Sequence, residues 1–338
     1  MESKKLLLTG VSGSIGIHFL AHFMRNTDWD IVGVASFRHK GNADKITDHL
    51  NAHPEDVPRF TLITHDLIGP FSETQKKRIG KVDYIINLAS ASDVEDSIHN
   101  PTYFIRNNIE STLNMLEYAR EVKPEAFIQF STDEVYGPCE KGERFEEWSP
   151  ILPSNPYAAS KASQEAIAIS YWRTYNLPLI ITNTVNNWGE KQQPKKFPVI
   201  IQKKIARDEV VPIHGSEGKI GTRYYIHSRN VADAVLFILK NTEPYLHRSN
   251  AVDRPDRYNI TSDTCWDNLE LAKKIAYFMG KELKFELVDH HSTRPGHDMA
   301  YSLSGEKLKK LGWKQPVSTE ESLKSVIDWQ TEHPEWIS

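Results

Sequence analysis

Two short stretches carry residue types that together could move protons on a sugar or another alcohol. Residues 131–137 read STDEVYG, and residues 157–161 read YAASK. Tyr157 and Lys161 are four residues apart and would share one face of a helix. An ammonium group beside a phenol favours the phenolate, so we expect Lys161 to lower the pKa of Tyr157 from about 10. A phenol tuned in this way can take a proton from a hydroxyl group at neutral pH.

The elements that must position these residues are a strand and a helix. Residues 126–130 form an apolar run that predicts a short buried strand, and a helical pattern extends from Tyr157 to Tyr175. Ligands of open α/β sheets bind at the carboxyl ends of the strands, which is where Thr132, Asp133 and Glu134 would lie. Two carboxyl groups beside one phenol imply more than one proton transfer.

The chain begins with a pattern typical of dinucleotide binding. Residues 4–8 predict a buried strand, residues 9–16 read TGVSGSIG, and a helical pattern runs on to about Asn26. The three glycines permit a tight turn, close approach of a pyrophosphate and close packing of the helix, whose N-terminus then faces an anion. The predicted cofactor contacts in this turn are Gly10, Ser12, Gly13, Ser14, Ile15 and Gly16.

The second strand, at residues 30–35, ends in a way that favours NADP as cofactor over the alternative, NAD. An NAD site usually ends this strand with an acid for the ribose 2′-hydroxyl, but here Ser36, Arg38 and His39 follow Ala35. Arginine offers a fork of donors to a 2′-phosphate. The alternative interpretation is a solvated basic loop.

Later strand ends complete the predicted cofactor groove. Asp66 and Leu67 follow a third strand and could meet the adenine, while Leu88 and Ala89 end a fourth and leave room for a flat cofactor. Strands alternate with helices throughout, which predicts an α/β fold with a Rossmann-like, doubly wound parallel sheet.

The composition of the sequence changes near residue 186, where Pro, Gly and Lys become frequent. We predict a dinucleotide-binding domain at 1–185 plus about 227–262, with a late strand at 257–260 returning to the main sheet. A smaller C-terminal substrate-binding lobe would comprise 186–226 and about 263–338. The polar stretch 142–156 is either an active-site lid or an ordinary connector.

Several cations of the lobe could serve a nucleotide-diphosphate sugar, although each could also be plain surface charge. They are Arg223, Arg294, Lys195 and Lys196, and His297 is either a structural histidine or a phosphate ligand. A second Tyr-x-x-x-Lys pattern, Tyr277 and Lys281, follows no polar strand end, and we interpret it as coincidence.

Composition narrows the class of protein. The 338 residues carry a net charge of −4, which argues against a general nucleic-acid binder. Cys139 and Cys265 are the only cysteines and show no metal-ligand spacing, so we expect neither a disulfide framework nor a structural zinc. Apolar runs are too short for a signal peptide or a membrane span, which predicts a soluble cytoplasmic protein.

Taken together, the motifs resemble the extended short-chain dehydrogenase/reductase family, and within it the nucleotide-sugar 4,6-dehydratases of the dTDP-glucose type. The resemblance runs nearly end to end. Its specific points are residues 131–137, 154–163 (SNPYAASKAS), 186–189 (NNWG) and 294–298 (RPGHD). It implies a homodimer formed through the helices at 101–120 and 157–175.

The resemblance also implies a mechanism and a set of substrate contacts. Tyr157 would deprotonate the sugar C4 hydroxyl as hydride leaves C4, with Thr132 bonded to that hydroxyl and Lys161 holding Tyr157 and the cofactor ribose. Glu134 would then take the C5 proton, and Asp133, its pKa raised by burial and by its neighbour, would protonate the leaving C6 hydroxyl. The expected substrate-binding residues are Ser92, Asn187, Lys196, Arg223, Arg294 and His297.

Some positions depart from the dTDP-glucose type. Ala91 and Asp93 stand where that type carries Glu and His, and Ala35 stands in place of the cofactor acid. These departures bear on the sugar, the nucleotide and the cofactor. The alternatives are a nucleotide-sugar 4-epimerase or C6 decarboxylase on the same fold, which would not use Asp133 as an acid, or a non-catalytic NADP-binding protein.

Overall fold

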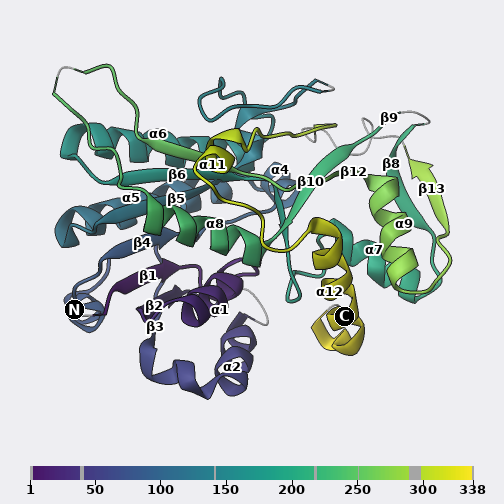
Figure 1. Ribbon diagram of the computed structural model, residues 1–338, viewed down its shortest axis with the longest axis horizontal. Coiled ribbons are helices and arrows are strands. Elements are labelled where there is room, and N and C mark those ends of the chain that lie inside the picture. The colour runs from purple at the N-terminus through teal and green to yellow at the C-terminus, as the bar shows by residue number, and fades with distance from the viewer. Residues whose placement is uncertain are drawn as a thin grey trace.

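A computed structural model describes residues 3–38, 42–140, 142–216, 219–249, 251–288 and 298–336. The predictions made for His39, Arg294 and His297 therefore lie outside the described residues. The main sheet has the strand order β11-β6-β5-β4-β1-β2-β3, and every neighbouring pair is parallel (Figure 1). Its strands are β1 (Lys5–Thr9), β2 (Asp30–Ala35), β3 (Phe60–Thr64), β4 (Tyr84–Asn87), β5 (Ala126–Thr132), β6 (Leu179–Thr184) and β11 (Asp256–Ile260).

Helices cover both faces of this sheet, as the alternation of side chains along a strand requires. Leu6 and Leu8 of β1 pack in one core cluster with helices α1 (Gly16–Asn26) and α8 (Ser228–Asn241). Leu7 points the other way, into a second cluster with α5 (Pro101–Val122) and α6 (Pro156–Tyr175). The expected doubly wound α/β architecture is confirmed.

An Asn followed by Pro sets the start of two of the connecting helices. The side chain of Asn155 accepts a hydrogen bond from the Ala158 N–H, and Pro156 occupies the first turn of α6. Asn100 and Pro101 start α5 in the same way. An Asn cap followed by Pro satisfies an N–H that has no partner inside the helix and pre-sets the first helical φ angle. The other helices flanking the sheet are α2 (Asn42–Ala52), α3 (Glu73–Ile79) and α4 (Val94–His99).

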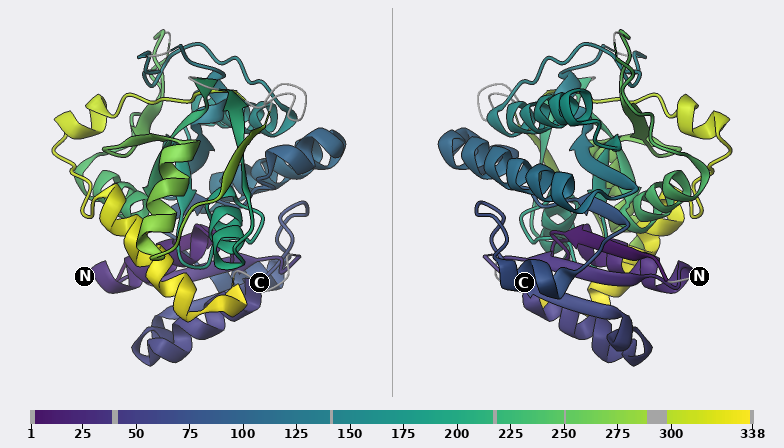
Figure 2. Two further views of the ribbon diagram at one scale, coloured as in Figure 1. Left: turned by 90° about the vertical axis from the view of Figure 1, so that its right-hand side faces the viewer. Right: turned by 90° about the vertical axis from the view of Figure 1, so that its left-hand side faces the viewer.

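A smaller layer lies beside the main sheet (Figure 2). It has its own core, which is built around Trp188, Trp266 and Leu271. It contains two three-stranded sheets, ordered β12-β10-β7 and β13-β8-β9. Their strands are β7 (Asn186–Trp188), β8 (Val211–Ser216), β9 (Lys219–Ile220), β10 (Thr222–His227), β12 (Cys265–Asp267) and β13 (Phe285–Val288). Its described helices are α7 (Phe197–Ala206), α9 (Asn268–Phe278) and α12 (Thr319–Glu332), whereas α11 (Glu306–Lys310) packs on β11 with Leu308 in the core of the main sheet.

Two details bear on the predictions. β11 pairs with β6 at the edge of the main sheet, so the late returning strand is confirmed. Helix α9 ends at Phe278, before Lys281, and the side chain of Tyr277 is 78% exposed, which fits the interpretation of that second motif as coincidence.

The stretch 142–156 is held in place by hydrogen bonds in the manner of a connector. The backbone of Phe145 exchanges hydrogen bonds with Ser302 and Ser304, and the Tyr136 hydroxyl donates to the Glu147 carbonyl. Among the described helices, none is long and apolar enough to cross a membrane.

Candidate active site

The end of β5 and the start of α6 bring four polar side chains into one cluster. The Thr132 hydroxyl donates to Asp133 Oδ1 at 2.9 Å, and it is also hydrogen-bonded to the side chain of Tyr157. Asn155 Nδ2, at the start of α6, donates to Glu134 Oε2 at 3.1 Å. Thr132, Asp133, Glu134 and Tyr157 therefore face one space. Asn155 was missed as a site residue, although its capping position before Pro156 is a signal that sequence reasoning could have used.

The pKa values of both carboxyl groups lie above their ordinary values. Burial raises the pKa of Asp133 to about 7, and the charge of Glu134 adds to the effect. Asp133 Oδ2 is buried without a hydrogen-bond partner among the described residues. Burial also raises the pKa of Glu134, against the hydrogen bond from Asn155 and the positive charge of Arg223. The expected upward shift at Asp133 is confirmed, for the two causes predicted.

The expectation that Lys161 lowers the pKa of Tyr157 is wrong for the protein without a bound cofactor. Burial raises the pKa of Tyr157, and the nearby carboxyl groups of Glu134 and Asp133 raise it further. Lys161 Nζ instead donates to the Phe130 carbonyl at 2.7 Å, at the back of β5. Burial lowers the pKa of Lys161 to about 7, so its ammonium is a weak source of positive potential.

The small lobe brings the predicted residue Arg223 near the carboxyl pair, together with the segment 298–301, which was not predicted as part of the site. The Arg223 guanidinium donates to the carbonyls of Thr222, Met299 and Asp298, and it stacks on the Tyr301 ring at 4.7 Å. The charges of Arg223 and Asp298 both act on Glu134. Arg223 therefore reaches the predicted site, but most of its visible contacts hold the 298–301 segment. No local sequence pattern links this segment to β5.

A second group from the lobe meets helix α4. Lys196 Nζ, just before α7, donates to the Ser92 carbonyl at 2.9 Å and pairs with the Asp93 carboxylate at 3.4 Å. The negative charge of Asp93 also acts on Tyr157, so this pair borders the catalytic cluster. Asn187 lies further back, donating to Thr184 and Val185, while its Oδ1 is buried and has no partner among the described residues.

The glycine-rich turn fits a dinucleotide. Gly10 has a φ of +67°, and a Cβ there would come within 3.1 Å of the Ala89 backbone. A Cβ on Gly16 would lie 2.1 Å from the Gly10 carbonyl oxygen, so only glycine allows this close turn. No side chain caps the N-terminus of α1. Its positive end is thus available to a phosphate group.

The basic end of β2 is partly neutralised. Arg38 Nη2 donates to Asn107 Oδ1 at 2.7 Å and pairs with Asp66 Oδ1 at 3.2 Å, and Arg38 Nε lies 3.3 Å from the Ser36 hydroxyl. The structure therefore brings Ser36, Arg38 and Asp66 together beside the expected adenosine position. Leu67 follows on the same loop, where its carbonyl accepts a hydrogen bond from Asn114.

One cluster has the ligand types of a metal site but the hydrogen bonds of a structural network. His18, Glu190 and His227 offer atoms within 4.8 Å of one another. His227 Nδ1 accepts the Arg229 N–H at 3.0 Å, so its Nε2 carries the hydrogen that it donates to Glu190 at 3.1 Å. A metal at that Nε2 would have to displace this hydrogen. The cluster ties α1 to the lobe.

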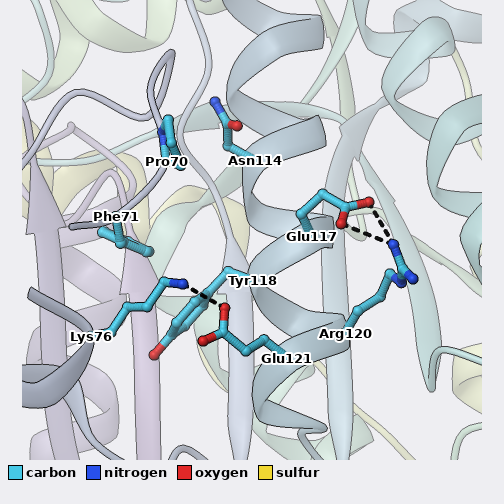
Figure 3. Close-up of a pocket in the computed structure, with 8 residues that line it drawn as sticks. All are labelled: Pro70, Phe71, Lys76, Asn114, Glu117, Tyr118, Arg120 and Glu121. Atoms are coloured by element: carbon cyan, nitrogen blue, oxygen red, sulfur yellow. Dashed lines mark hydrogen bonds and ion pairs between the residues drawn. The ribbon is translucent and has the colours of Figure 1, made fainter. Parts of the chain in front are cut away.

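A separate pocket lies between α3 and α5 (Figure 3), and none of its lining residues belongs to the cluster at the end of β5. Its charged side chains are mutually paired, Lys76 with Glu121 and Arg120 with Glu117. The remaining lining residues are Pro70, Phe71, Asn114 and Tyr118. We assign this pocket no part in the chemistry.

The parallel sheet, the glycine turn and the cluster at β5 define the class of the protein, an enzyme of the extended short-chain dehydrogenase/reductase type. A family model described as GDP-mannose 4,6 dehydratase matches residues 7–326, and the chain belongs to this family. The expected resemblance to nucleotide-sugar 4,6-dehydratases is thereby confirmed at the level of the family.

Three known proteins illustrate the relationship. The low-salt glycan biosynthesis protein Agl12 of Haloferax volcanii is 32% identical over 96% of this chain and 97% of its own length. The dTDP-D-glucose 4,6-dehydratase of Mus musculus is 30% identical over 97% of this chain and 88% of its own length. The structure of DesIV, a dTDP-glucose 4,6-dehydratase from Streptomyces venezuelae with NAD and TYD bound, aligns with a TM-score of 0.85 at 27% identity, covering 98% of both chains.

Proposed function

We propose that the protein is a nucleotide-sugar 4,6-dehydratase, which converts an NDP-hexose to an NDP-4-keto-6-deoxyhexose. The observation that carries the proposal is the convergence of Asp133, Glu134 and Tyr157, with burial and Glu134 raising the pKa of Asp133 to about 7. A 4-epimerase needs the phenol but has no step for a carboxylic acid that donates a proton. Dehydration needs both an acid and a base beside the same ring.

Each residue has a role that its position supports. Tyr157, bonded to Thr132, takes the proton of the sugar C4 hydroxyl, and the bound nicotinamide supplies the reversible redox chemistry at C4 and C6. A ketone at C4 acidifies the C5 hydrogen, which Glu134 removes. Asp133 delivers its proton to the C6 hydroxyl, which leaves as water. Lys161, whose pKa burial lowers to about 7, would hold the cofactor ribose and lend charge to Tyr157 once the site is filled.

The proposal is tested by incubating the protein with a panel of nucleotide hexoses in D2O and following the sugar by NMR. We expect a 4-keto-6-deoxy product that carries deuterium at C5. Asp133→Asn should abolish water loss while C5 exchange continues, and Glu134→Gln should abolish both. A C4 epimer made equally well by Asp133→Asn would overturn dehydration. No turnover of any hexose, with dinucleotide still bound, would favour a non-catalytic protein.

For the cofactor we now favour NAD. The preference for NADP that the sequence suggested gains no support from DesIV, which was solved with NAD, and Asp66 already neutralises much of the charge of Arg38. Mass spectrometry of the nucleotide released on denaturation decides between the two. Recovery of NADP alone would restore the original preference and assign Arg38 to the 2′-phosphate.

We further infer a homodimer formed through α5 and α6. These helices expose apolar side chains, including Tyr103, Leu113 and Tyr175, which are 38%, 40% and 48% exposed. Light scattering should give twice the chain mass, and Leu113→Glu should shift it toward the monomer. A monomeric wild type would refute this. The domain boundaries near residues 186, 227 and 262 and the cytoplasmic location stay predictions.

A further inference from the structure

Lys45, on α2, is a buried cation with an incomplete set of partners. Its side chain is 4% exposed, and Nζ donates to the Ser14 hydroxyl at 3.3 Å. No carboxylate of the described residues lies within ion-pairing distance of it. An ammonium group has three hydrogens to donate, and burying one without a counter-charge is costly. The nearby cation Lys191 makes this worse, although Lys191 itself pairs with Asp48 at 2.9 Å.

The atoms around Ser14 indicate what would complete this set. Ser14 belongs to the glycine-rich turn, and the N–H groups of Ser12, Ser14 and Ile15 make no backbone hydrogen bond within the described part of the chain. Helix α1 begins at Gly16 without a side-chain cap. Free N–H groups, the positive end of a helix dipole and an ammonium group thus meet at one turn, an arrangement suited to a doubly charged ligand group.

We propose that Lys45 is the counter-ion of the cofactor pyrophosphate, an assignment that rests on the dinucleotide binding proposed above. The 2′-phosphate of NADP is the other phosphate to consider. The ribose 2′ position, however, is recognised at the end of β2, where Ser36 and Arg38 lie, whereas the pyrophosphate is recognised at the start of α1. Because Lys45 contacts Ser14, which lies in the turn before α1, it belongs to the pyrophosphate site.

The charge state of Lys45 supplies an independent signature. Burial, followed by the charge of Lys191, lowers its pKa to about 8. A bound pyrophosphate would favour the ammonium form and raise the pKa again. Cofactor binding just above pH 8 should therefore take up a fraction of a proton, which a merely structural lysine would not do.

The experiment is calorimetric titration of nucleotide-free protein with NAD and with NADP at pH 8.5, in two buffers of different ionisation enthalpy. Lys45→Met should weaken both dinucleotides by the same factor, about tenfold or more, and should abolish the proton uptake. Lys77→Met, which removes an exposed lysine on α3, is the matched control and should behave as wild type.

The other outcomes each decide the matter. Unchanged affinities in a less stable Lys45→Met protein would make Lys45 purely structural and overturn the proposal. Weakening of NADP alone would move Lys45 to the 2′-phosphate and also overturn it. If Lys45→Met fails to fold, absence of proton uptake in the wild type refutes the proposal by itself. A wild type that binds neither dinucleotide contradicts the proposed function instead.

Discussion

Two buried or nearly buried carboxyl groups of this protein are shifted in opposite directions, and the cause lies in their hydrogen bonds. Asp133 accepts a hydrogen bond from Thr132, its Oδ2 has no partner among the described residues, and burial raises its pKa to about 7. Burial would also raise the pKa of Glu190, but the hydrogen bond from His227 leads the effects that outweigh it, and the pKa falls well below its usual value.

The difference distinguishes Asp133, which we propose as a proton donor, from Glu190, which has a structural role. Asp133 has one oxygen without a partner among the described residues, and its raised pKa suits the proton donor that we propose it to be. The carboxylate of Glu190 accepts hydrogen bonds from the His227 imidazole, and it stays ionised as a fixed charge between α1 and the lobe. Burial alone therefore does not set the direction of the pKa shift, and the hydrogen bonds to each carboxylate must be considered with it.

The largest expected effect is the loss of turnover in a variant at the proposed active site. Tyr157→Phe should lower kcat by about a thousandfold, because it removes the phenol that we propose as the base for the C4 hydroxyl. Product formation by NMR is the measurement. Tyr277→Phe, in the exposed second copy of the motif, is the control and should keep full activity.

A second test sets the stability of Asp133→Asn against pH. The folded pKa of Asp133 is about 7 and its ordinary value is 3.8, so the folded state holds the proton more tightly. Wild-type stability should therefore fall as pH rises from about 4 to 7, and above this range the variant should be more stable by roughly 2 to 4 kcal/mol. Urea unfolding at pH 4 and pH 8 measures this. If the difference in unfolding free energy between Asp133→Asn and wild type were the same at pH 4 and pH 8, the raised pKa of Asp133 would be contradicted.

Glu190→Gln should show the opposite sign. The folded pKa of Glu190 is lowered, so its contribution is present above the ordinary value of 4.5 and is lost as pH falls below it. At pH 7 the variant should be less stable by about 1 to 3 kcal/mol, because hydrogen bonds to a charged acceptor are lost. The gap should narrow in acid, and a gap that does not depend on pH would show that packing, not charge, holds this cluster.

The smallest effect comes from a neutral contact to the same residue. Gln330 Nε2 donates to the Glu190 carbonyl at 2.9 Å. Gln330→Ala should cost about 1 kcal/mol, by an amount that does not change between pH 4 and pH 8. A pH-dependent loss in this variant would mean that the Glu190 carboxylate had also moved.

The sequence predicts most of the fold because the signals are local. Alternating strands and helices and the glycine spacing after β1 each act over a few residues, and residues 131–134 are contiguous at a strand end. Contacts between distant segments left no such signal. Asp298 acts on Glu134 from far along the chain, Lys45 lies in an ordinary polar helix, and Lys161 turns toward the Phe130 carbonyl because that acceptor is within reach.

The position of β11 has a consequence for how the chain is made. Strand β6 has its outer partner only when residues 256–260 pair with it, after the segments of β7 to β10 have been synthesised. A sheet that forms on the ribosome before these residues emerge would have β6 as an open edge. Such edges invite pairing with other chains, so this protein should depend on chaperones during synthesis more than during refolding of the complete chain.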